Sequence, residues 1–357
     1  MKNKKLRKAG ALTLVAALLM TLLAACGGST TSAPAATDGE DAEGQTYELR
    51  LATLYPTEHE MTIATQAACD RIEEETGGAV KIQIYPSDSL GDYTSVYEEV
   101  MKGTIDMTVN TMVTTYDSTL EMLTIPYLAS SYDEAKAVFC DPDSYFFQTV
   151  KERQEALGIE TLGIYIAGAM GIGASKHLDN VMDPTVSKSD LIRCPSMDSY
   201  LWTAEGFGFK TVTIPYSELY TSLQTGVCDG WVGGGAYVNY ISFRDVLKYF
   251  ADARYLYEQI VCVINKDLFD GMPAEYQEII QNAFKDATFD FCDQMEDLDN
   301  QAMADMEAMG IEIYSPTEEE YETMKTYFNE NVWPKYENTL DKAVYDSLIA
   351  NGLKEAA

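Results

Sequence analysis

Histidine, the residue type that most often serves in acid/base catalysis and metal binding, is scarce in this chain of 357 residues, and nothing singles out a catalytic pair among its many carboxylates. His59 and His177 are its two histidines, which disfavours multi-histidine metal sites and most histidine-based catalysis. No HExxH, GxSxG or EF-hand pattern occurs. A glycine-rich run at 168–176 fits neither the dinucleotide-binding nor the P-loop spacing, and small residues near a hinge explain it better. We therefore expect no enzymatic activity, no cofactor and no metal.

The charge balance excludes two further classes of partner. The chain has 57 acidic and 25 basic side chains, a formal net charge of -32, and five of the basic ones lie in residues 1–8. Without that segment the net charge is -37. Nucleic-acid binding rests on cationic neutralisation of phosphates, and docking on anionic lipid rests on basic patches, so we expect neither.

The N-terminus is typical of an export signal. The basic residues 1–8 precede a mostly apolar, uncharged stretch of 15 residues, 9–23, which is too short for a membrane-spanning helix. The following Leu-Ala-Ala-Cys resembles a bacterial lipobox, so we expect residues 1–25 to be removed and Cys26 to be lipidated. An ordinary signal peptide with a chance cysteine is the alternative. Residues 26–46 then form a flexible tether, and the protein is anchored outside the cytoplasmic membrane or is periplasmic.

Six further cysteines follow, with no pair closer than 30 residues, so no zinc-ribbon or CxxC spacing exists. Cys69 and Cys262 lie in apolar patterns that suit buried thiols. Although export permits disulfides, we expect few or none.

Apolar runs alternate with helical patterns from Tyr47 onward, which is typical of an α/β chain with parallel sheets. Strands are expected at 47–53, 80–85, 105–110, 160–166, 210–214, 258–264 and 311–314. Helices are expected at 61–75, 94–102, 200–206, 216–225 and 318–348, with a broken one at 132–157. The pattern at 273–309 predicts a helix of roughly 54 Å, long enough to bridge two lobes.

Short signatures occur in one order along this region. The sequence reads ETGG at 75–78, LG at 90–91, GTIDM at 103–107, IPYL at 125–128, IRCP at 192–195, and YSELY to TGVCDG over 216–230. Together they resemble the DctP-type solute-binding proteins of tripartite ATP-independent periplasmic (TRAP) transporters, over about residues 47–350.

The resemblance implies a two-lobed periplasmic-binding-protein fold of type II-like architecture, with two sheets flanked by helices and a long helix across both. Lobe I would comprise 47–167 and about 257–295, and lobe II 168–256 and about 296–357. It also implies uptake driven by an ion gradient, with a small and a large membrane subunit as partners.

In this family an arginine in the IRCP signature holds a ligand carboxylate, and Arg193 occupies that place. A planar, permanently charged guanidinium matches two carboxylate oxygens. By the same resemblance Tyr216 could stack on the ligand, and Asn110, Thr111 and Met112 should line the opposite lobe.

Departures from the family pattern predict the ligand class. Met170 stands where many members have a second arginine, and Gly233 beside Trp231 replaces an asparagine. Leu54 falls near the family's polar cleft residue, close to Tyr55 and His59. A thioether, an indole and added space suit a monocarboxylate with an apolar or aromatic body.

Four alternatives remain open. Met170 and Trp231 could simply be core residues. The chain could instead be an exported lipoprotein enzyme, an adhesin, or the binding protein of a different transporter class. An enzyme would need a visible nucleophile or acid/base set, and an adhesin would tend to show repeats or all-β patterning.

Overall fold

The computed structural model describes residues 45–351. The predicted signal peptide, Cys26 and all but the last two residues of the predicted tether lie outside the described residues. Among residues 45–351, no helix combines the length and the apolar character needed to cross a membrane.

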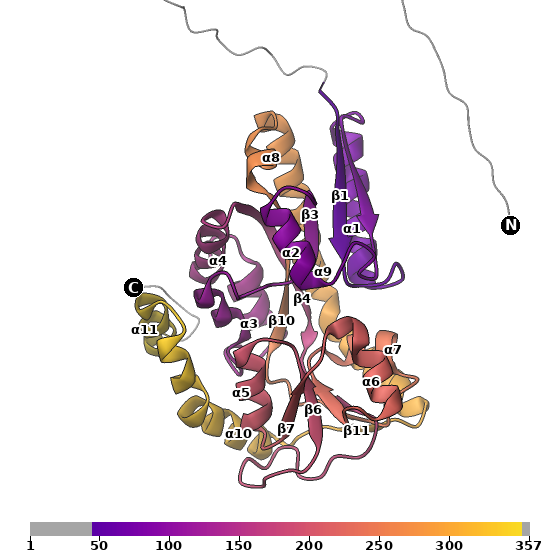
Figure 1. Cartoon of the computed structure of the whole chain (residues 1–357), viewed down its shortest axis with the longest axis vertical. Helices are drawn as coiled ribbons and strands as arrows, with labels where there is room; N and C mark the ends of the chain where they lie inside the picture. The colour runs from indigo at the N-terminus through magenta and orange to yellow at the C-terminus, as the bar shows by residue number, and fades with distance from the viewer. Residues whose placement is uncertain (1–44, 352–357) are drawn as a thin grey trace, which may run out of the picture. The chain divides into compact units, whose positions relative to one another are not determined.

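The first sheet has five strands in the order β2-β1-β3-β10-β4 (Figure 1). Their bounds are β1 Tyr47–Thr53, β2 Val80–Tyr85, β3 Met107–Thr111, β4 Ile159–Ala169 and β10 Tyr257–Asn265. β1 is parallel to β2 and β3, and α1 (Glu60–Glu75) and α2 (Tyr93–Met101) form the crossovers. In β2, Val80 and Ile82 are buried while Lys81 is exposed, as expected for a sheet with one covered face.

The second sheet has six strands in the order β11-β9-β5-β8-β6-β7. Their bounds are β5 Ile172–Ala174, β6 Leu191–Cys194, β7 Lys210–Thr213, β8 Gly230–Val232, β9 Tyr249–Ala251 and β11 Glu312–Tyr314. Between β4 and the long helix that begins at Ala274, the α-helices are α5 Asp198–Gly206, α6 Leu219–Thr225, α7 Ala236–Phe243 and α8 Lys266–Asp270.

Our expectation of parallel sheets was wrong, because both sheets are mixed. β10 is antiparallel to β3 and β4, and β5 is antiparallel to β8 and β9. β4 leads from the first sheet into the second, and β10 returns, with Tyr257 paired to Ala169. A strand that returns between two sheets beside the strand that left must run in the opposite direction.

The long helix α9 (Ala274–Ala308) has 35 residues, about 52 Å, and confirms the expected bridge. It packs on β4 and α1 on the side of the first sheet, and on α7 and β11 on the side of the second. Ile280, Phe284, Phe291 and Met295 form its buried stripe.

The C-terminal segment also contacts both sides. It comprises α10 (Glu318–Asn331), a 3-10 turn at Trp333–Asn338 and α11 (Lys342–Asn351). Phe328 of α10 packs on Phe207, which follows α5 on the side of the second sheet. Tyr336 of the 3-10 turn donates a hydrogen bond to the carbonyl of Thr124, between β3 and β4 of the first sheet, at 3.0 Å. We predicted that about 296–357 belongs with the second lobe. The last part of this segment covers the 3-10 turn Ser118–Thr124 and lies beside α4 (Tyr145–Glu155), which follows α3 (Tyr132–Ala135) along the chain (Figure 1). The lobe boundaries themselves remain a proposal.

A buried aspartate ties the strand crossing together. Asp299 of α9 accepts hydrogen bonds from the Tyr132 hydroxyl, from Ala169 N at 3.0 Å and from Tyr237 N at 2.7 Å. These donors belong to α3, β4 and α7 respectively. A Cβ on Gly168 or Gly235 would lie within 2.8 Å of the Asp299 carboxylate, so the backbone approaches it closely only because both residues are glycine.

The six described cysteines are free and buried. Burial raises the pKa of the Cys69 and Cys194 thiols to about 12. Cys140 and Cys292 lie with their sulfur atoms 2.9 Å apart, against the inner side of α9.

Candidate functional site

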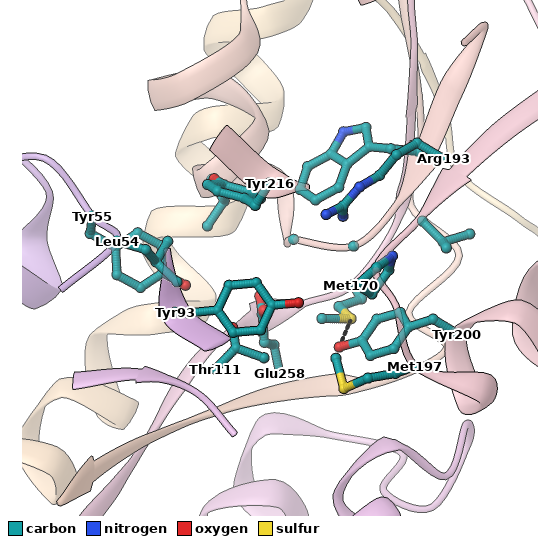
Figure 2. Close-up of a pocket in the computed structure, with 16 residues that line it drawn as sticks. Leu54, Tyr55, Tyr93, Thr111, Met170, Arg193, Met197, Tyr200, Tyr216 and Glu258 are labelled. Carbon is teal, nitrogen blue, oxygen red and sulfur yellow. Dashed lines mark hydrogen bonds between the residues drawn. The ribbon is translucent and has the colours of Figure 1, made fainter. Parts of the chain in front are cut away.

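A cavity lies where loops and strands of the two sheets meet (Figure 2). Each sheet contributes residues near strand ends, where α/β folds place their ligands. The lining residues are Leu54, Tyr55, Tyr93, Thr111, Met170, Arg193, Pro195, Met197, Tyr200, Tyr216, Trp231, Val232, Gly233, Gly234, Val238 and Glu258.

Arg193 supplies a positive charge to the cavity. It belongs to β6, is 3% exposed, and donates from Nε to the carbonyl of Ile214 at 2.8 Å. The Tyr216 ring centre lies 6.0 Å from its guanidinium carbon. Among residues 45–351 no carboxylate forms an ion pair with it, and burial lowers its pKa below the usual value. A buried, unpaired charge is costly, so an anion entering the cavity would be stabilised there.

The indole of Trp231 forms one wall. Its Nε1 donates to Asn239 Oδ1 at 3.0 Å, and the Asn239 amide nitrogen donates to the carbonyl of Gly235 at 2.9 Å. The ring also packs on Phe243 with centroids 5.0 Å apart. Gly233, with φ of +139°, lies against the indole, where a Cβ would come within 2.6 Å of the ring. The indole therefore has a fixed orientation before any ligand enters.

Replacing Gly173 by alanine should disturb this wall. The new Cβ would lie 2.3 Å from Asn239 Oδ1 and 2.9 Å from Trp231 Nε1, so both side chains must shift. We expect a loss of about 1–3 kcal/mol in stability and roughly tenfold weaker ligand binding, measured by denaturation and calorimetry. Gly226→Ala is the control: its φ of +73° strains any side chain, but no atom lies within 4 Å. The control should lower stability alone; equal affinity loss in both variants would contradict the prediction.

Four tyrosines surround the cavity: Tyr55, Tyr93, Tyr200 and Tyr216. Burial raises the pKa of all four phenols above the usual value, so each stays neutral and can donate a hydrogen bond at physiological pH. Tyr200 is placed near Met170, with its hydroxyl 4.0 Å from the sulfur.

Eight of the eleven predicted site residues line the cavity: Leu54, Tyr55, Thr111, Met170, Arg193, Tyr216, Trp231 and Gly233. His59, Asn110 and Met112 do not line it, and contact of any of the eleven residues with a ligand stays a prediction. All three are buried polar or sulfur groups that are used inside the protein.

Each of these three side chains is held away from the cavity by a different contact. His59 caps α1 by accepting from Met61 N at 3.2 Å and stacks on Tyr55, and burial lowers its pKa to about 3. Asn110 accepts from Leu54 N at 2.8 Å, which holds the loop after β1. Met112 accepts from the Gln154 amide at 3.0 Å in the core.

Half of the lining residues carried no signal that we recognised in the sequence, and Glu258 is the most consequential of these. It lies near the start of β10, between the buried Tyr257 and Gln259. Burial and, to a smaller extent, nearby Asp299 raise the pKa of its carboxyl to about 8, although Arg193 lowers it. The sequence did offer one signal for Glu258: an acidic residue within an otherwise mostly apolar strand, which is unusual unless the acid has a specific role.

In the described part of the chain, no group of three histidine, cysteine, aspartate or glutamate side chains is placed to hold a metal ion. The cavity instead offers one guanidinium, one carboxyl, four phenols and an apolar wall. Such a set can bind and orient a small charged molecule.

Comparisons with known proteins agree on one family. The sequence model of the bacterial extracellular solute-binding proteins, family 7 (DctP), matches residues 51–339. The chain is 25% identical over 270 residues to a solute-binding protein of Verminephrobacter eiseniae, covering 75% of this chain and 78% of that one. It is 25% identical over 227 residues to the 2,3-diketo-L-gulonate-binding periplasmic protein of Escherichia coli, covering 63% and 68%.

Among solved structures, the fold is similar to a TRAP periplasmic solute-binding protein from Desulfovibrio salexigens with bound orotic acid. The TM-score is 0.78 at 19% identity, and the match covers 86% of this chain and 99% of that one. The two-lobed fold expected from the sequence is thereby confirmed.

Proposed function

Because the chain belongs to family 7 of the bacterial extracellular solute-binding proteins, we propose that it captures a small organic acid for a TRAP transporter. The observation that carries the proposal is Arg193, a buried guanidinium that faces the cavity and has no carboxylate partner among the described residues. A ligand carboxylate would supply the missing partner through two parallel N–H···O bonds.

We further propose a monocarboxylate with an apolar or aromatic body. Leu54, Met170, Met197, Trp231 and Val238 supply most of the apolar wall, which favours such a body over one bearing several hydroxyls. Two similar proteins bind carboxylic acids, 2,3-diketo-L-gulonate and orotic acid, and the second is a flat ring.

Delivery would require two membrane subunits, one small and one large, and closure of the two lobes over the ligand. Cys26, if lipidated, would keep the protein at the outer side of the membrane. Since the chain carries a large negative charge, long-range attraction of an anion would be unfavourable. Capture would then depend on the local positive potential of Arg193.

A thermal-shift screen of organic acids tests the proposal. A ligand at 100 times its Kd stabilises the folded state by about 2.7 kcal/mol, which should raise the melting temperature by several degrees. We expect this shift with aromatic or branched monocarboxylates and little or none with C4-dicarboxylates. Stabilisation by the dicarboxylates alone would overturn the ligand class, and no stabilisation by any acid would overturn the function. Mass spectrometry of co-purified ligand gives an independent identification.

A further inference from the structure

Glu258 is a second ionisable group that has no hydrogen-bond or ion-pair partner among the described residues. Its carboxyl lines the same space as Arg193, and Figure 2 shows the two side chains entering from different sides. Among residues 45–351, no side chain or backbone group hydrogen-bonds to the Glu258 carboxyl, and it forms no ion pair with Arg193 or any other cation. In its ionised form an acid at this place would weaken the binding of a ligand that carries only negative charge, because like charges repel.

The cavity thus holds an unpaired guanidinium and an unpaired carboxyl that can ionise. Together they are complementary to a molecule that carries both a negative and a positive charge. Arg193 matches a carboxylate, and Glu258 matches a protonated nitrogen. Leaving either group without its partner inside the closed protein would cost free energy. Three phenol rings near the acid, Tyr55, Tyr200 and Tyr216, add faces that attract a cation.

We infer that the ligand is a zwitterion, with a carboxylate on Arg193, a protonated amine on Glu258 and an apolar side chain against the Trp231 wall. This inference rests on the proposed function and narrows its ligand to the amino-acid class. Glu258 is then the residue that distinguishes an amino acid from the corresponding acid without nitrogen.

The charges around Glu258 predict a linked proton release. Burial and Asp299 raise the pKa of its carboxyl to about 8, whereas Arg193 lowers it. The phenols that face it from the loop after β1, from α5 and from the turn at Tyr216 stay neutral. In the empty cavity the carboxyl is therefore mostly protonated at pH 7. A bound ammonium favours the carboxylate, so binding should release about one proton.

Calorimetry with matched ligand pairs tests the inference on the full chain. The pairs are L-phenylalanine with 3-phenylpropionate, and L-leucine with 4-methylpentanoate, which differ only in the ammonium group. We expect the amino acid of at least one pair to bind at least about tenfold more tightly than its partner. Its binding enthalpy should depend on the ionisation enthalpy of the buffer, and its affinity should rise between pH 6 and 8.

Glu258→Gln keeps the shape of the side chain and removes its charge. In this variant we expect the preference for the amino acid and the dependence on buffer to disappear, with an unchanged melting temperature. If the deaminated acids bind as tightly as the amino acids, and binding still requires Arg193, the zwitterion is wrong and the proposed function stands. If a keto acid binds best and Glu258→Gln lowers its affinity, the protonated Glu258 carboxyl donates a hydrogen bond to the keto oxygen of the ligand. In that case the inference is also wrong. If neither kind of acid binds, both proposals fail.

Discussion

Replacing Arg193 by alanine should weaken binding of the carboxylate ligand by roughly 100-fold or more. The guanidinium is 3% exposed, and within residues 45–351 its one hydrogen bond goes from Nε to the carbonyl of Ile214, which leaves its other N–H donors for a ligand. The change removes the cation that we pair with the carboxylate and leaves that carboxylate in a desolvated cavity. Isothermal titration calorimetry with the best acid from the screen measures the loss.

Two further variants separate charge, geometry and general effects. Arg193→Lys keeps the positive charge but not the planar fork, and should recover only part of the affinity. Lys176→Ala removes an exposed cation that is paired with Asp190 and Asp229, outside the cavity, and should leave affinity unchanged. Unchanged affinity in Arg193→Ala would remove the anchor from the proposed function.

Replacing Asp299 by alanine should lower the free energy of unfolding by about 3 kcal/mol or more. Its carboxylate accepts from the Tyr132 hydroxyl and from the backbone N–H groups of Ala169 and Tyr237, and all of these lose their acceptor. Because the donors belong to α3, β4 and α7, the loss would loosen the crossing between the two sheets. Urea denaturation measures the change; the exposed Asp297→Ala, two residues earlier in the same helix, should have almost no effect.

The same aspartate should make stability depend on pH. Burial raises the pKa of Asp299 from 3.8 to about 6, although its three hydrogen bonds lower it. A raised pKa means that the folded state favours the protonated form. The part of its contribution to the free energy of unfolding that depends on protonation is therefore full below pH 3.8. This part, on the order of 3 kcal/mol, is lost as the pH rises through about 6. In Asp299→Asn the free energy of unfolding should change less between pH 4 and pH 6.5 than in the unmodified protein. An equal change in both proteins would contradict the assignment of this pH dependence to Asp299.

Long, strongly patterned elements could be predicted from the sequence, whereas several of the shortest ones could not. β1, β2 and α9 occur within one residue of their expected bounds because their apolar periods are clear over six residues or more. β5, β8 and β9 have three residues each, too few to show a period, and they are strands only because neighbouring strands pair with them. The antiparallel return of β10 depends on contacts between distant segments, which no local pattern contains.

The cavity divides in the same way. Arg193, Met170 and Trp231 lie where the family resemblance placed the site. Glu258 and Tyr93 come from elements whose side-chain direction is set by pairing and packing, so their position was not visible in the sequence. The family resemblance led us to expect His59 and Asn110 at the ligand, whereas in the fold both accept hydrogen bonds from backbone N–H groups.

The fixed orientation of Trp231 means that the intrinsic fluorescence of the protein can report ligand binding. Of the three tryptophans, Trp231 is the one that lines the cavity; Trp202 packs on Tyr336, and Trp333 donates to the carbonyl of Pro126. A ligand that enters displaces water beside one indole and leaves the environments of the other two unchanged. Intrinsic fluorescence can therefore report occupancy from a single site, without a dye and without a label on the ligand.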